Sequence, residues 1–462
     1  MSRWFAFLLA AALVAGAAAD TPANCTSEDV VGKWTLWRSM RAVKPGTDCA
    51  QDPVWAGLPW LHSVYVDLLL PNKAVDEFGN EGSWTMVHNQ GVHIDVNGRT
   101  YFGYFAYSKD GRKITSYCQM VGRGLSHDVN MRHWACFYGQ KSGYAHSKTH
   151  DDVLQPHGPL EGHLTKEDHQ RVVAAVNART QLWKAELHEP FSTLSAEDLL
   201  RVRGGRNSWT GPRPRAAPAT PEQLRAAELL PPAFDWRDVN GVGYVSPVRD
   251  QGSCGSSYAF SSVGMMEARL RIRVNNTRTL SLSPQDVVSC SGLSQGCDGG
   301  IPFLIGGRYA QDYGMVPEQF APYTGRDSAC PRELCDRVYA ASYEYIGGYY
   351  GACNEAAMKL ALVRRGPLSV SLKVHPDFIH YKTGVYHRVT LDSDLELTPD
   401  LEVHHAVLLV GYGVDAQSGE KYWAVKNSWG RDWGEDGFFR IRRGQDEVGI
   451  ESLGMEAEPI PF

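Results

Sequence analysis

The first third of the chain alternates between apolar and polar residues with the period of a β-strand. Residues 92–96 and 100–104 both alternate in this way, and they flank Asn97-Gly98, a dipeptide typical of a tight hairpin turn. A second turn signal, Asp110-Gly111, precedes another strand pattern at residues 113–118. Short strands joined by tight turns predict an antiparallel barrel or sandwich from about residue 20 to residue 139.

The pattern becomes helical from about residue 164 to residue 203. Apolar residues recur there at helical spacing, at Val172, Val173, Val176 and Leu182, ahead of Trp183. Residues 193–197 (Thr-Leu-Ser-Ala-Glu) are typical of a capped helix start. Residues 204–218 are rich in Gly, Pro and Arg, which predicts either a flexible, protease-accessible linker or a plain interdomain linker.

The last region begins at about Leu230 and contains a further helical pattern. Its apolar residues lie three or four apart, at Phe260, Val263, Met266 and Leu270. Ser257 is therefore expected at a helix N-terminus, where unpaired backbone N–H groups and the helix dipole favour a developing negative charge.

Length, composition and charge bound the class of protein. A chain of 462 residues has room for two or three domains, and 43% hydrophobic and 11% aromatic residues fit a globular protein. The formal net charge of −6 gives no reason to expect nucleic acid or an acidic membrane surface as a partner.

Residues 1–19 predict a secretory signal peptide. Arg3 supplies the positive start, an apolar run follows, and Ala17-Ala18-Ala19 has the form of a cleavage site. The run is too short to span a bilayer, so no membrane anchor is expected. The mature chain should begin at Asp20 and belong to the secretory pathway, either lysosomal or extracellular.

Cysteines and sequons agree with that route. Ten cysteines in a secreted chain indicate disulfides. Asn24 and Asn275 each begin a glycosylation sequon, and an unmodified surface asparagine is the alternative at both.

Three motifs of the last region carry the candidate chemistry. They are residues 251–257 (Gln-Gly-Ser-Cys-Gly-Ser-Ser), residues 404–413 (His-His-Ala-Val-Leu-Leu-Val-Gly-Tyr-Gly) and residues 426–430 (Lys-Asn-Ser-Trp-Gly). At these residues the chain resembles the papain-like cysteine peptidases. In that family's first motif the second cysteine is the nucleophile, and here that position holds Ser257.

Within the family, the chain resembles the cathepsin C group of dipeptidyl peptidases. The resemblance covers essentially the whole chain. It is carried by the β-rich N-terminal region, by Tyr258 where most of the family has tryptophan, and by the runs 20–26, 354–359 and 439–444. We expect from it a protein that removes or binds the N-terminal dipeptides of peptides and proteins.

The resemblance implies an α+β fold in three parts. They are an antiparallel β-barrel exclusion domain at residues 20–139, a helical propeptide and linker at 140–229, and a two-lobed papain-like peptidase domain at 230–462. It further implies a homotetramer, and a division of the peptidase domain into heavy and light chains in the acidic loop 390–396.

The family's chemistry needs a thiolate paired with an imidazolium, a group that orients the histidine ring, and donors that stabilise an oxyanion. The resemblance assigns the base to His405 and the orienting group to Asn427. Gln251 becomes the oxyanion donor, and Trp429 shields the His405–Asn427 pair. His404 is expected to be a neighbour that faces away, although a role for it stays open.

Ser257 changes the mechanism itself. A hydroxyl must lose its proton during attack, and in serine peptidases a buried aspartate stabilises the imidazolium formed at that moment. This chain offers Asn427 instead, so we expect residual activity at best. Cys254 is a possible substitute nucleophile, but its family role is a structural disulfide and a loop residue there should not reach His405.

Two further sites follow from the resemblance, and no metal site is expected. Asp20 should accept the ammonium of a peptide N-terminus in a charge-assisted pair, unless it is merely an exposed chain end. A chloride ion should be held by the backbone N–H groups of Ile301 and Phe303 and by the hydroxyl of Tyr345.

The resemblance also implies four disulfides, namely Cys25–Cys118, Cys49–Cys136, Cys254–Cys297 and Cys290–Cys330. The family's partner for Cys335 should lie near residues 319–321, where this chain has no cysteine. Cys335 and Cys353 are therefore either free or newly paired. Two departures from the family pattern suggest natural divergence.

Three hypotheses result. The first is a dipeptidyl peptidase scaffold that is crippled at its nucleophile and binds peptide N-termini or an active paralogue. The second is a slow but active peptidase that uses Ser257. The third is a non-catalytic assembly protein, which has no physical need for Gln251, His405 and Asn427.

Overall fold

The computed structural model describes residues 21–39, 43–44, 47, 49, 62–143, 147–151, 165–205, 213–331, 335–392 and 404–461. The chain divides into two compact units, residues 1–155 with 210–212 and residues 156–209 with 213–462. The predicted signal peptide, Asp20 and most of the predicted heavy–light boundary lie outside the described residues.

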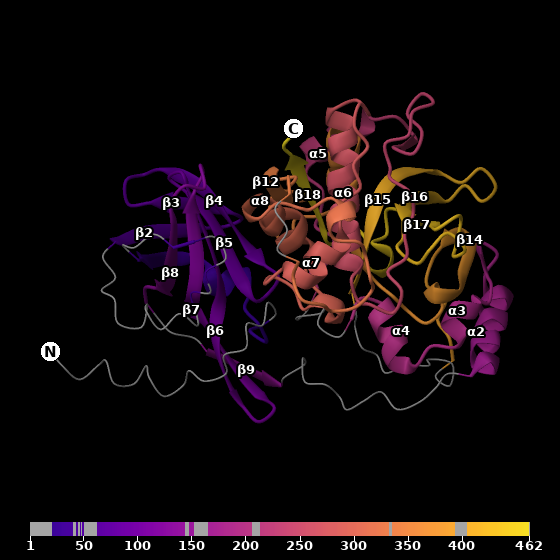
Figure 1. The fold of residues 1–462 in the computed structure, drawn as a ribbon, viewed down its shortest axis with the longest axis horizontal. Helices are drawn as coiled ribbons and strands as arrows, with labels where there is room; N and C mark the ends of the chain where they lie inside the picture. Colours follow the sequence, from indigo (N-terminus) through magenta and orange to yellow (C-terminus); the bar gives the residue numbers. More distant parts are fainter. Residues whose placement is uncertain are drawn as a thin grey trace. The chain divides into compact units, whose positions relative to one another are not determined.

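The first unit contains a closed antiparallel barrel of eight strands (Figure 1). Strands β1 to β8 are hydrogen-bonded in chain order, and β1 also pairs with β8, which closes the ring. A ninth strand, β9, adds to β7. The barrel, rather than the sandwich, is thus confirmed. The elements are α1 (Ser27–Val30), β1 (Gly32–Arg38), β2 (His62–Leu69), β3 (Lys73–Asp76), β4 (Glu81–Val87), β5 (Gly91–Val96), β6 (Arg99–Asp110), β7 (Lys113–Asp128), β8 (Trp134–Lys141) and β9 (Ser147–Asp151).

The predicted hairpin forms where its turn dipeptide indicates. β5 ends at Val96 and β6 begins at Arg99, and Asn97 and Gly98 have φ values of 50° and 68°. Both turn residues therefore lie in the left-handed region that a tight hairpin of this kind requires. Cys25–Cys118 and Cys49–Cys136 are the barrel's disulfides.

The second unit is built on a mixed sheet with helices around it (Figure 1). The strand order is β10-β14-β17-β16-β15-β13-β18-β12, and β11 pairs with β15. The strands are β10 (Trp183–Ala185), β11 (Phe234–Asp235), β12 (Ala340–Tyr345), β13 (Leu368–Lys373), β14 (Tyr381–Tyr386), β15 (His404–Val414), β16 (Lys421–Lys426), β17 (Phe438–Arg442) and β18 (Gly454–Pro459). The helices are α2 (Lys166–Arg179), α3 (Glu189–Ser192), α4 (Ala196–Val202), α5 (Pro221–Glu228), α6 (Ser257–Arg273), α7 (Pro284–Cys290), η3 (Gly296–Asp298), η4 (Phe303–Tyr309), α8 (Ala310–Asp312), η5 (Glu318–Phe320), α9 (Glu355–Arg365), η6 (Phe378–His380) and η7 (Glu447–Gly449).

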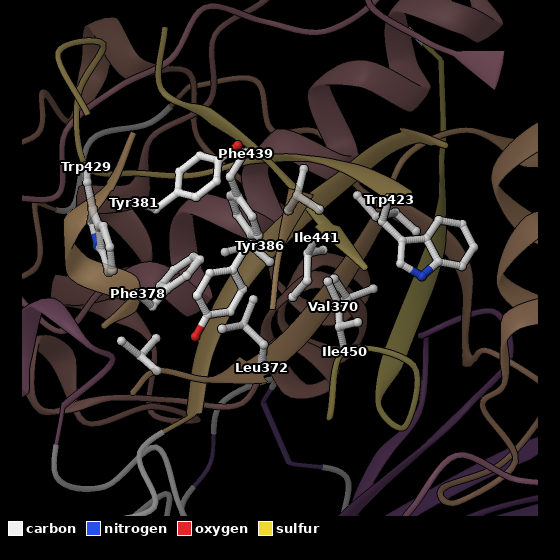
Figure 2. Close-up of a cluster of buried hydrophobic side chains, with 14 of the residues drawn as sticks. Val370, Leu372, Phe378, Tyr381, Tyr386, Trp423, Trp429, Phe439, Ile441 and Ile450 are labelled. Atoms are coloured by element: carbon white, nitrogen blue, oxygen red, sulfur yellow. The ribbon is translucent and has the colours of Figure 1, made fainter. Parts of the chain in front are cut away.

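One hydrophobic cluster joins the predicted propeptide to the predicted peptidase domain. Figure 2 shows its centre, with Phe378 and Tyr386 between Trp429 at one end and Trp423 at the other. Buried side chains of residues 172–202 pack into the same cluster. Because apolar burial is the main favourable term in folding, the propeptide is held by the same forces as the sheet itself.

The helical prediction for residues 164–203 is correct in part. Helices α2, α3 and α4 form, and the hydroxyl of Ser195 caps α4 by accepting a hydrogen bond from the Asp198 N–H. Trp183, however, begins strand β10, which forms the edge of the sheet and pairs with β14. Trp183 is buried beside Tyr386 in this strand. Tertiary packing therefore decides its conformation, although the apolar residues before it recur with the helical period.

A search of the described helices for a membrane span gives a negative result, because none is both long enough and apolar enough to cross a bilayer.

Candidate active site

Ser257 is the first residue of helix α6, as the sequence predicted. Its side chain is 1% exposed, and its Oγ accepts a hydrogen bond of 3.2 Å from the backbone N–H of Ala406 on strand β15. The 17-residue helix directs its N-terminal dipole toward this oxygen.

His405 lies on strand β15 and Asn427 directly follows the adjacent strand β16, and the two form the expected pair. His405 Nε2 lies 2.7 Å from Asn427 Oδ1, which also accepts the Ser428 N–H at 2.8 Å. Since an amide oxygen only accepts, Nε2 carries the proton, and the lone pair of Nδ1 is left as the base. Trp429 covers the pair, with its ring centre 4.9 Å from that of His405.

The state of His405 is that of a neutral base. Burial lowers its pKa to about 4, and the hydrogen bond to Asn427 offsets part of that effect. Nδ1 is buried and, in the part of the chain that the structure describes, has no hydrogen-bond partner. Ser257 is therefore bonded to a backbone N–H beside His405, and not to the ring.

Gln251, the expected oxyanion donor, is held by hydrogen bonds on its side chain and on its backbone. Its Nε2 donates to the carbonyl of Cys254 at 2.9 Å, and its Oε1 accepts the hydroxyl of Ser428 at 2.6 Å. Its backbone N–H donates to the Ser428 carbonyl at 2.8 Å. The side-chain amide is thus held at its nitrogen and at its oxygen, and one of its two N–H groups points toward the cleft.

The end of helix α4 fills that cleft. The carbonyl of Val202 accepts hydrogen bonds from Gln251 Nε2 and from Trp429 Nε1, both at 3.2 Å. Arg203 donates to the carbonyl of Val374 at 2.6 Å. A Cβ on Gly205 would lie 2.5 Å from the carbonyl oxygen of Asp298, so the backbone at Gly205 is in close contact with the backbone at Asp298. The predicted propeptide therefore covers the candidate catalytic residues.

Cys254 does not act as a second nucleophile in this arrangement, because it forms a disulfide with Cys297. The fourth bridge, Cys290–Cys330, is also present. Cys335 and Cys353 are both free thiols, and Cys353 is buried. Burial raises the pKa of the Cys353 thiol, which makes it unreactive.

The remaining predicted site residues are those of the chloride site, the two glycosylation sequons and Asp20. The rings of Phe303 and Tyr345 stack with centres 4.0 Å apart, and both residues are buried, as is Ile301. Asn275 is exposed, and Asn24 is half-buried beside Asn89. Asp20 lies outside the described residues.

Comparison with known proteins gives the family. The profile described as papain family cysteine protease matches residues 230–457, and the profile described as cathepsin C exclusion domain matches residues 20–141. Cathepsin C of Schistosoma mansoni is 40% identical over 454 residues, which is 96% of each chain. The chain belongs to the papain family of cysteine proteases. It carries the exclusion domain of the cathepsin C group, as the motifs indicated.

Other similar proteins include proforms of cathepsins. Pro-cathepsin H of Mus musculus is 35% identical over 293 residues, 63% of this chain and 81% of the relative. Among solved structures, procathepsin L 3 of Tenebrio molitor (TM-score 0.50, 28% identity) covers 63% of this chain and 89% of its own. ProCathepsin B S9 of Trypanosoma congolense (TM-score 0.51, 26% identity) covers 65% and 100%.

Sequence reasoning missed three contacts of the site. They are the Ala406 N–H on Ser257, the Val202 carbonyl on Gln251, and the hydroxyl of Tyr323 on the loop before Ser257. The first two involve backbone atoms, whose contacts cannot be predicted from the type of residue. For Val202, the one available signal was its place at the end of a helical stretch.

Proposed function

We propose that this protein is a catalytically impaired dipeptidyl peptidase homologue that binds the N-terminal dipeptides of peptides and proteins. One observation carries the proposal. Ser257 Oγ accepts a hydrogen bond from Ala406 N–H, while the base nitrogen of His405 has no partner among the described residues.

The chemistry explains why this arrangement is slow. A serine attack needs the hydroxyl proton to pass to His405, and burial holds the pKa of that ring at about 4. Asn427 orients the ring but brings no negative charge to stabilise the imidazolium. Binding does not suffer in the same way, because Gln251 and Trp429 hold a peptide carbonyl in the covered form.

A slow peptidase is the second candidate. It is favoured by the intact His405–Asn427 bond of 2.7 Å, which leaves Nδ1 of His405 available as a base once the propeptide is removed. The two candidates share one binding site and differ in turnover alone.

The remaining features of the proposal come from the cathepsin C likeness. They are Asp20 as the group that pairs with the peptide's ammonium, a homotetrameric assembly, and a lysosomal or extracellular location. Chloride would be held by Ile301, Phe303 and Tyr345, where it would fix the wall of the neighbouring pocket. The stacked rings of Phe303 and Tyr345 support this, because they bring the Tyr345 side chain to the residue whose backbone N–H would be one of the donors.

The test compares peptides with a free N-terminus and the same peptides acetylated there, after removal of the propeptide. We expect the Ser257 protein to bind the free forms, and to hydrolyse a dipeptide amide at least about 10³-fold more slowly than the Ser257→Cys variant. Ser257→Cys with His405→Ala is the control for enzymatic turnover. Equal binding of free and acetylated peptides overturns the proposal, whereas comparable turnover by the serine and cysteine forms selects the slow peptidase.

A further inference from the structure

The loop 251–256 carries two functional groups of the site at its two ends. Gln251 supplies the oxyanion donor at one end, and Ser256 leads into Ser257 at the other. Backbone hydrogen bonds hold parts of this loop, from Gln251 N to the Ser428 carbonyl and from Gly255 N to the Cys297 carbonyl, each 2.8 Å long. These backbone bonds tie each end to a different neighbour, and within the loop the Gln251 side chain also reaches the Cys254 carbonyl at 2.9 Å.

The hydroxyl of Tyr323 contacts both ends of the loop. It donates to the carbonyl of Gln251 at 2.8 Å, and it lies 2.7 Å from Oγ of Ser256. Because the single phenol proton goes to the carbonyl, Ser256 is the donor in the second bond. One oxygen atom therefore joins the backbone of Gln251 to the residue before helix α6, in addition to the bond from Gln251 Nε2 to Cys254.

Tyr323 is itself held on several sides. Its N–H donates to Oε1 of Glu318 at 2.8 Å, and its ring packs edge-on against Phe260 of α6 with centres 4.8 Å apart. The next residue, Thr324, donates its N–H and its hydroxyl to Gln285, each at 2.9 Å. Burial raises the pKa of Tyr323 to about 12, so the phenol keeps its proton at physiological pH.

We infer that Tyr323 is a positioning residue that sets the oxyanion donor Gln251 and residue 257 at their working separation. The inference deepens the proposed function, since it rests on the same site. The segment that carries Tyr323 is the one in which the family's cysteine partner of Cys335 is missing. Because that disulfide is absent, the hydrogen bonds that attach this segment to the loop matter more here.

The test uses the processed Ser257→Cys protein with and without Tyr323→Phe, which removes the hydroxyl and keeps the ring against Phe260. Affinity is measured for a dipeptide aldehyde, which forms a tetrahedral adduct with an oxyanion, and for the corresponding dipeptide alcohol, which has no carbonyl at that carbon and forms no adduct. We expect the aldehyde to bind about five- to tenfold more weakly to the double variant, the size of one hydrogen bond, and the alcohol to bind equally to both. For substrate turnover, kcat falls and KM stays.

Tyr412→Phe is the matched control. Its hydroxyl donates to the carbonyl of Pro231 at 2.8 Å, the same kind of bond at the same length, far along strand β15 from His405. It should leave both affinities unchanged. If Tyr323→Phe weakens binding of the aldehyde and the alcohol equally, or behaves as Tyr412→Phe does, the positioning role is wrong.

A second measurement needs no peptide. The rate at which a small alkylating reagent modifies the thiol introduced by Ser257→Cys is followed against pH. We expect Tyr323→Phe to raise the apparent pKa of this thiol, because a loosened loop holds the sulfur less well at the helix N-terminus. An unchanged profile overturns the inference, even where peptide binding has failed and the proposed function has failed with it.

Discussion

The carbonyl of Val202 lies 3.2 Å from Nε2 of Gln251, the group expected to hold a substrate oxyanion. A backbone carbonyl of the predicted propeptide thus occupies the amide group that we propose as the oxyanion donor. Ser257 is 1% exposed in the same arrangement, so the covered form should be closed to reagents as well as to peptides.

This closure predicts selective thiol labelling of the unprocessed Ser257→Cys protein. We expect the thiol introduced at position 257 to react at least about tenfold more slowly before propeptide removal than after it, because reaction requires local opening. Cys335, which is a half-buried free thiol, should react at similar rates in both forms and is the internal control. Mass spectrometry of labelled peptides makes the comparison, and equal rates at position 257 would show that the cleft is open.

A buried histidine pair should make the docking of the predicted propeptide sensitive to pH. His169 on α2 and His380 on η6 approach to 3.1 Å between Nδ1 and Nε2, and both are fully buried. Burial lowers the pKa of His169, and burial together with the neighbouring His169 and His188 lowers the pKa of His380 to about 3. Folded-state values below the ordinary 6.5 mean that stability is complete above about pH 6.5 and is lost as the pH falls below it.

Other groups near the pair modify this dependence. Asp168 raises the pKa of His169, and the Glu186 N–H bonds to the carbonyl of His380. Asp377 beside η6 acts in the opposite sense, because burial raises its pKa to about 7 and the folded state then gains stability as the pH falls toward 4. The pH dependence of a variant relative to the natural protein is therefore the informative quantity.

His169→Gln should weaken the pH dependence of the proform. Glutamine can donate to His380 but cannot become charged. Between pH 7.5 and pH 4.5 we expect the variant to lose about 1–3 kcal/mol less free energy of unfolding than the natural proform in urea titrations. His150→Gln, in the barrel, is the control and should follow the natural protein. Equal pH slopes for all three proteins would exclude the pair as the sensitive contact.

The fold could be predicted where local pattern and tertiary packing agree. The Asn97-Gly98 hairpin and the start of α6 at Ser257 both have sequence signals that act over a few residues. Trp183 fails the prediction because a strand edge that is distant in the sequence decides its conformation. The pairing of His405 with Asn427 followed from the family motifs, whereas the contact of Val202 with Gln251 depends on backbone geometry that side-chain identity does not encode.

Replacement of Asn427 by aspartate should improve the serine form. A carboxylate raises the pKa of His405 from about 4 and stabilises the imidazolium that forms during attack. The change also removes Nδ2 of Asn427, a buried donor that has no partner among the described residues. We expect hydrolysis of a dipeptide amide by the processed protein to rise at least about tenfold, and to stay below that of Ser257→Cys.

The pH profile separates this explanation from a general gain in stability. The base must be neutral, so activity is lost as the pH falls through the pKa of His405, and Asn427→Asp should move that limb to higher pH. Asn427→Ala should lower activity and bring no such shift. If the acidic limb of the pH profile moves to higher pH but the rate of hydrolysis does not rise, then the carboxylate has raised the pKa of His405 and Ser257 still fails to transfer its proton.

Chloride should tighten peptide binding through Tyr345. A phenol hydroxyl that donates to an anion forms a stronger bond than one between neutral groups, and here the ring is stacked 4.0 Å from Phe303, which keeps the hydroxyl in place. In the processed protein we expect exchange of chloride for acetate to weaken binding of a peptide with a free N-terminus about tenfold.

Tyr345→Phe should keep the ring stacked on Phe303 and lose this dependence on chloride. Tyr343, whose ring also contacts Phe303 at 5.1 Å, provides the matched control, since Tyr343→Phe should retain it. Chloride dependence that survives Tyr345→Phe would place the ion elsewhere, and affinity that ignores chloride in the natural protein would remove it from the site.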